Sequence, residues 1–316
     1  MRLPGRQEVP VPWHDFAFNL TARSAQPPEI VMKIHDYESH PRLAELLTPP
    51  DKLAALLAGT GCFVLDMDGT IYLGGTLFPF AKDFLAAAAT AGKRYIWFTN
   101  NSSRAPEDYL ERLAGFGIPT SRRDFLMSTD VALDWLGRER AGETAWVVGT
   151  PQLHAAFAGA GIVSDDPRAD YVVLGFDTTL TYAKLVVACD LLRAGRPLYL
   201  VNMDYNCPVE GGFIPDAGSM AALIERSTGV TGPSFGKPTR TCLDYILKQT
   251  GCREADLTFI GDRLYTDIAI ARGTRAHSIL VLTGEATVDD CLTTDAAPDA
   301  IVRSLADLIP LLEERS

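Results

Sequence analysis

Two aspartates, Asp66 and Asp68, lie two residues apart in the segment CFVLDMDGT, directly after a short apolar run. The run is rich in branched and aromatic side chains, as is typical of a buried strand. Carboxylates at this spacing repel one another, so a cation or a proton has to offset their charge. The pair therefore predicts a positively charged partner elsewhere in the site.

Three further polar clusters follow strand-like runs later in the chain. Taken alone, each cluster has an ordinary explanation, because Asp-Gly pairs form turns, Asn-Asn-Ser caps helices and Gly-Lys-Pro occurs in loops. In open α/β sheets, however, ligands bind beyond the carboxyl ends of the strands. Four clusters at successive strand ends therefore indicate one shared site. The three later clusters are Thr99, Asn100 and Asn101 in FTNNS, Lys237 in FGKP, and Asp262 with Asp267 in GDRLYTD.

The elements that position these clusters alternate between strand and helix from residue 60 onward. The segment CFVLDMD is typical of a buried parallel strand, and PFAKDFLAAAATAG indicates a helix closed by Gly92. This alternation predicts an α/β fold with a Rossmann-like parallel sheet and right-handed crossovers. A second strand-helix series interrupts it. We expect a core in two parts, 51–139 and 233–316, with an inserted α/β unit over 140–232.

Residues 1–50 differ from the rest of the chain. They are rich in proline and show little periodicity, so we expect a poorly ordered arm. The segment that begins at Met32 resembles the start of a domain more closely than the segment at Met1 does. A true start at Met32 is therefore an open alternative.

The composition is that of a globular protein. Hydrophobic residues make up 47% of the 316 residues and charged residues 22%. The net charge of −11 and the absence of a basic run argue against nucleic-acid and membrane partners. The six cysteines are scattered, which favours reduced thiols over zinc or disulfides. No membrane span or signal peptide is recognisable, so we expect a cytoplasmic protein.

The order of the four clusters resembles the motifs of the haloacid dehalogenase superfamily of phosphohydrolases. The motif DMDGTIY and the inserted unit resemble the subgroup that carries a large type-two cap. That subgroup includes nitrophenyl phosphate, nucleotide, pyridoxal phosphate and sugar phosphate phosphatases. The resemblance covers residues 60 to about 310.

The resemblance implies a role for each cluster. Asp66 would attack phosphorus to form an aspartyl-phosphate, while Asp68 would act as general acid and then as general base. Thr70 would help to hold the loop. Phosphoryl transfer depends mainly on positioning and charge neutralisation, which Lys237 and a bound Mg²⁺ would supply. The residues expected to bind phosphate are Thr99, Asn100 and Asn101, and those expected to bind Mg²⁺ are Asp66, Asp68 through its backbone carbonyl, Asp262 and, through water or indirectly, Asp267.

These observations predict a Mg²⁺-dependent phosphomonoester hydrolase that acts on a small organic phosphate. A phosphotransferase or phosphomutase of the same superfamily and a non-catalytic protein that binds a phosphate metabolite are the alternatives. A dinucleotide-binding protein is disfavoured, because no Gly-x-Gly-x-x-Gly follows the first strand. A homo-oligomer formed through the cap is left open.

The segment from Asn202 to Met220, NMDYNCPVEGGFIPDAGSM, is the expected specificity loop of the cap. Tyr205 and Phe213 could stack on a ring or a sugar face of the substrate. The loop contains no lysine or arginine, so it would give little help to a second anionic group. A connection without substrate contacts is the alternative, in which case the segment from Gly149 to His154 would take this role.

Overall fold

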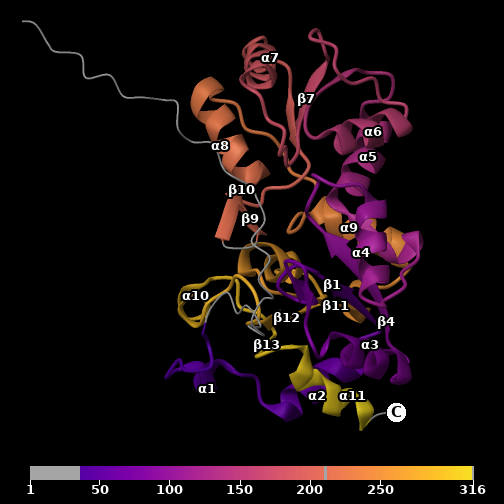
Figure 1. Ribbon diagram of the computed structural model, residues 1–316, viewed down its shortest axis with the longest axis vertical. Helices are drawn as coiled ribbons and strands as arrows, with labels where there is room; N and C mark the ends of the chain where they lie inside the picture. Colours follow the sequence, from indigo (N-terminus) through magenta and orange to yellow (C-terminus); the bar gives the residue numbers. More distant parts are fainter. Residues whose placement is uncertain (1–35, 210–211, 315–316) are drawn as a thin grey trace, which may run out of the picture. The chain divides into compact units, whose positions relative to one another are not determined.

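The computed structural model describes residues 36–209 and 212–314, which belong to one compact unit, Met32–Ser316. Its core sheet has six strands in the order β13-β12-β11-β1-β4-β5, and every neighbouring pair is parallel. Figure 1 shows indigo and purple strands beside orange and yellow ones, because the chain returns to this sheet after the inserted unit. The strands are β1 (Cys62–Leu65), β4 (Arg94–Thr99), β5 (Phe125–Met127), β11 (Leu257–Gly261), β12 (His277–Val281) and β13 (Ala300–Val302).

Both faces of the core sheet are buried, which explains the continuous apolar runs of its strands. Successive side chains of a strand point to opposite faces. Phe63 and Leu65 therefore pack in one hydrophobic cluster with Phe84, whereas Val64 packs in a second cluster with Ile246. The helices of the core are α2 (Pro50–Gly59), α3 (Ala81–Thr90), α4 (Pro106–Gly115), α5 (Ser128–Glu139), α9 (Arg240–Thr250), α10 (Val288–Thr293) and α11 (Ile309–Glu313).

The inserted unit, which we call the cap, has its own parallel sheet with strand order β6-β7-β8. Its strands and helices are β6 (Ala145–Val148), α6 (Pro151–Gly159), β7 (Tyr171–Leu174), α7 (Tyr182–Arg193), β8 (Leu198–Leu200) and α8 (Ala217–Thr228). An antiparallel hairpin, β9 (Asn206–Val209) and β10 (Gly212–Pro215), precedes α8. The predicted α/β fold, with a parallel core sheet and an inserted α/β unit, is thus confirmed.

Apolar packing connects the cap to the core. The ring of Trp135 on α5 lies 5.3 Å from that of Tyr199 on β8 and 5.2 Å from that of Phe235, which precedes α9 of the core. The same hydrophobic cluster contains Val147 and Phe157 of the cap. One face of the cap sheet is therefore continuous with the hydrophobic interior of the core.

Of the N-terminal arm expected over 1–50, residues 1–35 lie outside the described residues. Residues 36–50 pack against the core. They include α1 (Leu43–Leu46), in which Leu43 is buried. Thr48 exchanges two hydrogen bonds with Ile301 of β13, at 2.9 Å and 2.8 Å.

Over residues 36–209 and 212–314, no helix combines the length and the apolar character needed to cross a membrane. All six cysteines lie in these ranges, and none forms a disulfide there.

Candidate active site

The four polar clusters meet at the carboxyl edge of the core sheet. Asp66 directly follows β1, Thr99 ends β4 and Asp262 directly follows β11. The backbone N–H of Asp66 continues the sheet by donating to the carbonyl of Ile260 at 2.9 Å. Because β1 lies between β4 and β11, the carboxylate of Asp66 lies between the cluster that begins at Thr99 and the cluster that begins at Asp262.

Lys237 supplies the positive charge that the paired aspartates predict. Its Nζ lies 2.9 Å from Asp66 Oδ1 and 2.6 Å from Asp267 Oδ1, and it also donates to the Phe98 carbonyl at 3.2 Å. Burial alone would lower the pKa of Lys237, but the carboxylates of Asp267 and Asp66 outweigh burial and raise it. The ammonium group is therefore held charged between two carboxylates.

Asp66, Asp262 and Asp267 form an acidic cluster in which one oxygen of each lies within 4.8 Å of the others. Asp262 Oδ2 accepts from the backbone N–H of Glu285 at 2.7 Å, whereas the buried Oδ1 has no hydrogen-bond partner among the described residues. Burial raises the pKa of Asp262, and the neighbouring carboxylates raise it further. A buried, unpartnered carboxylate oxygen beside two more carboxylates fits a hard divalent cation.

The turn after Asp68 packs tightly against this cluster. Gly69 has a φ of +82°, and a Cβ there would lie 2.3 Å from Asp262 Oδ2. Only glycine satisfies both requirements. The adjacent Thr70 is fully buried, and its hydroxyl has no hydrogen-bond partner within the described part of the chain.

The carboxyl group of Asp68 belongs to a different environment from that of Asp66. Tyr72 Oη donates to Asp68 Oδ2 at 3.4 Å. Burial raises the pKa of Asp68, opposed by the nearby Arg112 and Arg263. A raised pKa favours the protonated form, which is the form that a general acid requires.

The side chain of Asn100 joins the second cluster to the third. Its Nδ2 donates to Asp204 Oδ1 at 2.7 Å and to the Lys237 carbonyl at 3.0 Å, while its Oδ1 accepts from the Lys237 N–H at 2.8 Å. Thr99 Oγ1 accepts from the backbone N–H of Asn101 at 3.1 Å. These bonds fix the loop after β4 beside Lys237.

A second group of polar residues was not assigned to the site from the sequence, although Asn202 and Asp204 lie in the expected specificity loop. Arg263 Nη1 lies 2.7 Å from Asp204 Oδ2, and its Nε lies 2.9 Å from Glu285 Oε2. Asn202 Oδ1 accepts from the hydroxyl of Ser102 at 2.9 Å. Asp204 and Asn202 follow strand β8 of the cap, so the strand-end argument used for the other clusters could have identified them.

A cavity of about 710 Å³ opens beside Asp68. Tyr205 and Phe213 do not line it, and their side chains are 53% and 47% exposed. Other residues of the expected loop do line it, as does the segment from Thr150 to Gln152. The lining residues used below are Asp68, Arg104, Asp108 and Arg112 from the core, with Thr179 and Ile214 from the cap.

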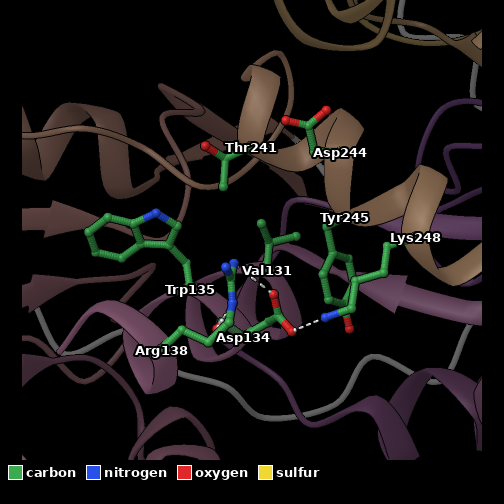
Figure 2. Close-up of a pocket in the computed structure, with 8 residues that line it drawn as sticks. All are labelled: Val131, Asp134, Trp135, Arg138, Thr241, Asp244, Tyr245 and Lys248. Atoms are coloured by element: carbon green, nitrogen blue, oxygen red, sulfur yellow. Dashed lines mark hydrogen bonds and ion pairs between the residues drawn. The ribbon is translucent and has the colours of Figure 1, made fainter. Parts of the chain in front are cut away.

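A second cavity, of about 480 Å³, lies between α5 and α9 and contains none of the predicted site residues. Figure 2 shows Asp134 on α5 between Arg138 and Lys248, at 3.1 Å and 2.7 Å. The carboxylate of Asp134 in this cavity is thus already neutralised by Arg138 and Lys248.

Known proteins resemble this chain in both sequence and fold. Residues 63–163 match the family described as haloacid dehalogenase-like hydrolase, and residues 234–308 match HAD-hydrolase-like. An acid sugar phosphatase of Staphylococcus aureus (strain MRSA252) is 30% identical over 253 residues, which cover 80% of this chain and 98% of the relative.

Solved structures of phosphatases share the fold of this chain. The 4-nitrophenylphosphatase of Thermotoga maritima aligns with a TM-score of 0.77 and 38% identity, covering 81% of this chain and 98% of its own. The glycerol phosphate phosphatase of Mycobacterium tuberculosis, in complex with calcium, aligns with a TM-score of 0.72 and 28% identity, covering 80% and 76%.

The fold and the comparisons define a hydrolase with a parallel core sheet and an inserted cap. The chain belongs to the haloacid dehalogenase-like hydrolases, in the group of sugar phosphatases and p-nitrophenylphosphatases that carry a cap. The resemblance identified from the sequence is confirmed.

Proposed function

We propose that this hydrolase is a Mg²⁺-dependent phosphomonoesterase that cleaves a small organic phosphate through an aspartyl-phosphate. The observation that carries the proposal is the placement of Lys237 Nζ between Asp66 and Asp267, beside the unpartnered Oδ1 of Asp262. An anionic nucleophile, a fixed ammonium group and a free carboxylate oxygen are the parts that phosphoryl transfer needs.

In the first step, Asp66 Oδ attacks phosphorus, and the bond between phosphorus and the ester oxygen breaks. Asp68 donates its proton to the departing oxygen, so the leaving group departs as a neutral alcohol. In the second step, Asp68 accepts a proton from water, whose oxygen attacks phosphorus. The phosphorus–Asp66 bond breaks, inorganic phosphate leaves, and both aspartates return to their starting states.

Lys237 neutralises negative charge on Asp66 and on the phosphoryl oxygens in both steps. Thr99, Asn100 and Asn101 form the loop beside it that would bind the remaining oxygens. Mg²⁺, held by Asp66, Asp262 and the Asp68 carbonyl, would neutralise charge between the carboxylates and the phosphate when bound.

Asp267 has a supporting role in this arrangement. Its Oδ1 lies 2.6 Å from Lys237 Nζ, and its Oδ2 accepts from the backbone N–H of Arg263 at 3.1 Å. We therefore assign it to orienting Lys237 and completing the surroundings of the metal, in keeping with the indirect contact expected from the sequence.

A homo-oligomer formed through the cap is part of the same proposal. The large hydrophobic side chains that are exposed in the described part of the chain all belong to the cap and its hairpin. They are Val163, Tyr182, Val186, Tyr205, Val209, Phe213 and Leu223. This distribution favours a protein interface on the cap. Sedimentation equilibrium tests it, and a monomer at all concentrations would contradict it.

The activity is tested with p-nitrophenyl phosphate. We expect the purified chain to release phosphate with Mg²⁺, to stop when the metal is chelated, and to recover when Mg²⁺ is restored. Asp66→Asn should abolish turnover without unfolding the protein. Retention of a tenth of the activity in that variant would refute Asp66 as nucleophile. Binding of esters without phosphate release would instead favour a non-catalytic protein, and transfer to an alcohol acceptor would favour a phosphotransferase.

A further inference from the structure

The cavity beside Asp68 is where the leaving group of a substrate has to lie. A general acid sits next to the ester oxygen that it protonates, so the organic part of the substrate extends away from Asp68. Asp68 lines the cavity, whereas Asp66, Lys237 and Asp262 do not. The phosphoryl group and the organic part therefore have separate surroundings.

Four charged side chains line this cavity: Asp68, Arg104, Asp108 and Arg112. Asp108 Oδ2 accepts from the backbone N–H of Ala105 at 3.0 Å, so this carboxylate closes the first turn of α4. Asp108 is thus engaged by the backbone and Asp68 is assigned to the reaction. The two guanidinium groups are therefore the charged groups of the lining that remain for a ligand.

Neither arginine is neutralised by an ion pair with any residue that the structure describes. Arg112 is partly buried; it donates to the Gly74 carbonyl, and its guanidinium carbon lies 4.4 Å from the centroid of the Tyr72 ring. Arg104 is exposed and forms no hydrogen bond within residues 36–209 and 212–314. Both arginines line the same cavity as Asp68.

We propose that Arg104 and Arg112 select phosphate esters whose leaving group carries a negative charge of its own, either a carboxylate or a second phosphate. The proposal rests on the proposed phosphatase activity. Guanidinium groups bind such anions through paired hydrogen bonds. Lys237 already serves the phosphoryl group that is cleaved, which leaves these arginines for a different anion.

The specificity loop contains no lysine or arginine, so from the sequence we expected little help for a second anionic group of the substrate. The cations come from the core instead, from Arg104 ahead of α4 and from Arg112 within it. The cap side of the cavity contributes uncharged residues such as Thr179 and Ile214. The core thus supplies the cations that would bind an anionic leaving group, and the described residues of the cap add no negative charge to the lining of the cavity.

The test compares esters that differ in one group. Glycerol 3-phosphate and 3-phosphoglycerate differ by a hydroxymethyl group against a carboxylate, and the monophosphate and bisphosphate of propane-1,3-diol differ by a second phosphate. Wild-type kcat/KM should be higher for at least one charged member, and the pair that shows the effect identifies the anion. Arg104→Gln should reduce that kcat/KM roughly 10-fold, as for a lost hydrogen bond to a charged group. It should reduce the uncharged partner's value much less.

Arg123→Gln is the matched control, because Arg123 is an exposed arginine that does not line the cavity. It should leave both values unchanged. Arg112→Lys keeps the charge but loses the paired geometry, and it should reduce hydrolysis of the charged ester more than that of the uncharged one. Equal wild-type kcat/KM within both pairs, or equal losses in Arg104→Gln, would overturn the proposal. Hydrolysis of glycerol 3-phosphate would still support the phosphatase activity, so the two failures are distinguishable.

Discussion

Asp204 of the cap lies with its Oδ2 2.7 Å from Arg263 Nη1 and with its Oδ1 2.7 Å from Asn100 Nδ2. One carboxylate from the segment after β8 thus joins two loops of the core active site. Arg263 directly follows Asp262 of the acidic cluster, and Asn100 contacts Lys237. The position of the cap is therefore linked to the groups that we propose bind the phosphate and the metal.

The first prediction concerns this link. Asp204→Asn keeps an acceptor for Asn100 but removes the charge that faces the buried Arg263. Breaking a buried ion pair costs roughly 3 to 5 kcal/mol, and we expect a loss of unfolding free energy near the lower end because Glu285 remains beside Arg263. Denaturant unfolding measures it. Asp166→Asn, which alters an exposed pair with Arg168, is the control and should change stability little. Equal stability of Asp204→Asn and wild type would contradict the link.

The second prediction concerns the metal. A cation that binds only the folded state raises the melting temperature, so Mg²⁺ should stabilise the wild type. Asp262→Asn removes the unpartnered carboxylate oxygen and should abolish that shift, as thermal unfolding with and without Mg²⁺ will show. Asp295→Asn changes an exposed carboxylate and should retain the shift. A full Mg²⁺ shift in Asp262→Asn would place the metal elsewhere.

The third prediction concerns Lys237. Lys237→Met removes the ammonium group that lowers the pKa of the buried Asp66, while the carboxylate of Asp267 remains beside it. Burial and the charge of Asp267 therefore raise the pKa of Asp66 further in the folded state. A raised carboxyl pKa makes the folded state bind more protons than the unfolded state. Stability should therefore fall as the pH rises above about 4 and recover on acidification. Denaturant unfolding from pH 4 to 8 measures this, and a pH profile parallel to that of the wild type would disprove it.

The fourth prediction concerns Asp216, whose side chain caps α8 and accepts from Asn202 Nδ2 at 3.0 Å. Burial and the charge of Asp204 raise the pKa of Asp216 from 3.8 to about 7. Because the folded-state value is the higher one, this group stabilises most below pH 4 and loses that contribution as the pH rises towards 7. Asp216→Asn should remove this slope, at most about 4 kcal/mol in all. Denaturant unfolding at pH 4 and pH 7 measures the difference in unfolding free energy between Asp216→Asn and wild type. The same difference at both pH values would contradict the raised pKa of Asp216.

The sequence located the core motifs because parallel strands place their carboxyl ends at one edge. Asp66, Thr99 and Asp262 each stand at a strand end, so topology alone brings them together. Lys237 does not follow a core strand, so the strand-end argument was wrong for this residue, although Lys237 does lie beside Asp66.

The residues that line the cavity beside Asp68 were harder to predict. In the hairpin, Ile214 lines the cavity whereas its neighbour Phe213 does not, and on the facing strand the consecutive residues Cys207, Pro208 and Val209 all line it. Alternation along a strand therefore does not decide which residues of the hairpin reach the cavity. The packing of the hairpin decides it, and the sequence gives no measure of that packing. Arg104 and Arg112 were overlooked because the search for specificity was confined to the cap.

The cap is inserted in the chain between strands β5 and β11 of the core sheet, and this order has a consequence for biosynthesis. Cys62 of β1 pairs with Arg94 of β4 on one side and with Leu257 of β11 on the other, beyond the whole inserted unit. A ribosome therefore delivers the first half of the core sheet long before β11 is made, while the three-stranded sheet of the cap is complete at Leu200. In that interval one edge of β1 has no partner, and an unpaired apolar strand edge invites association with other chains. An unpaired edge of β1 therefore exposes the nascent protein to aggregation while its cap is being synthesised.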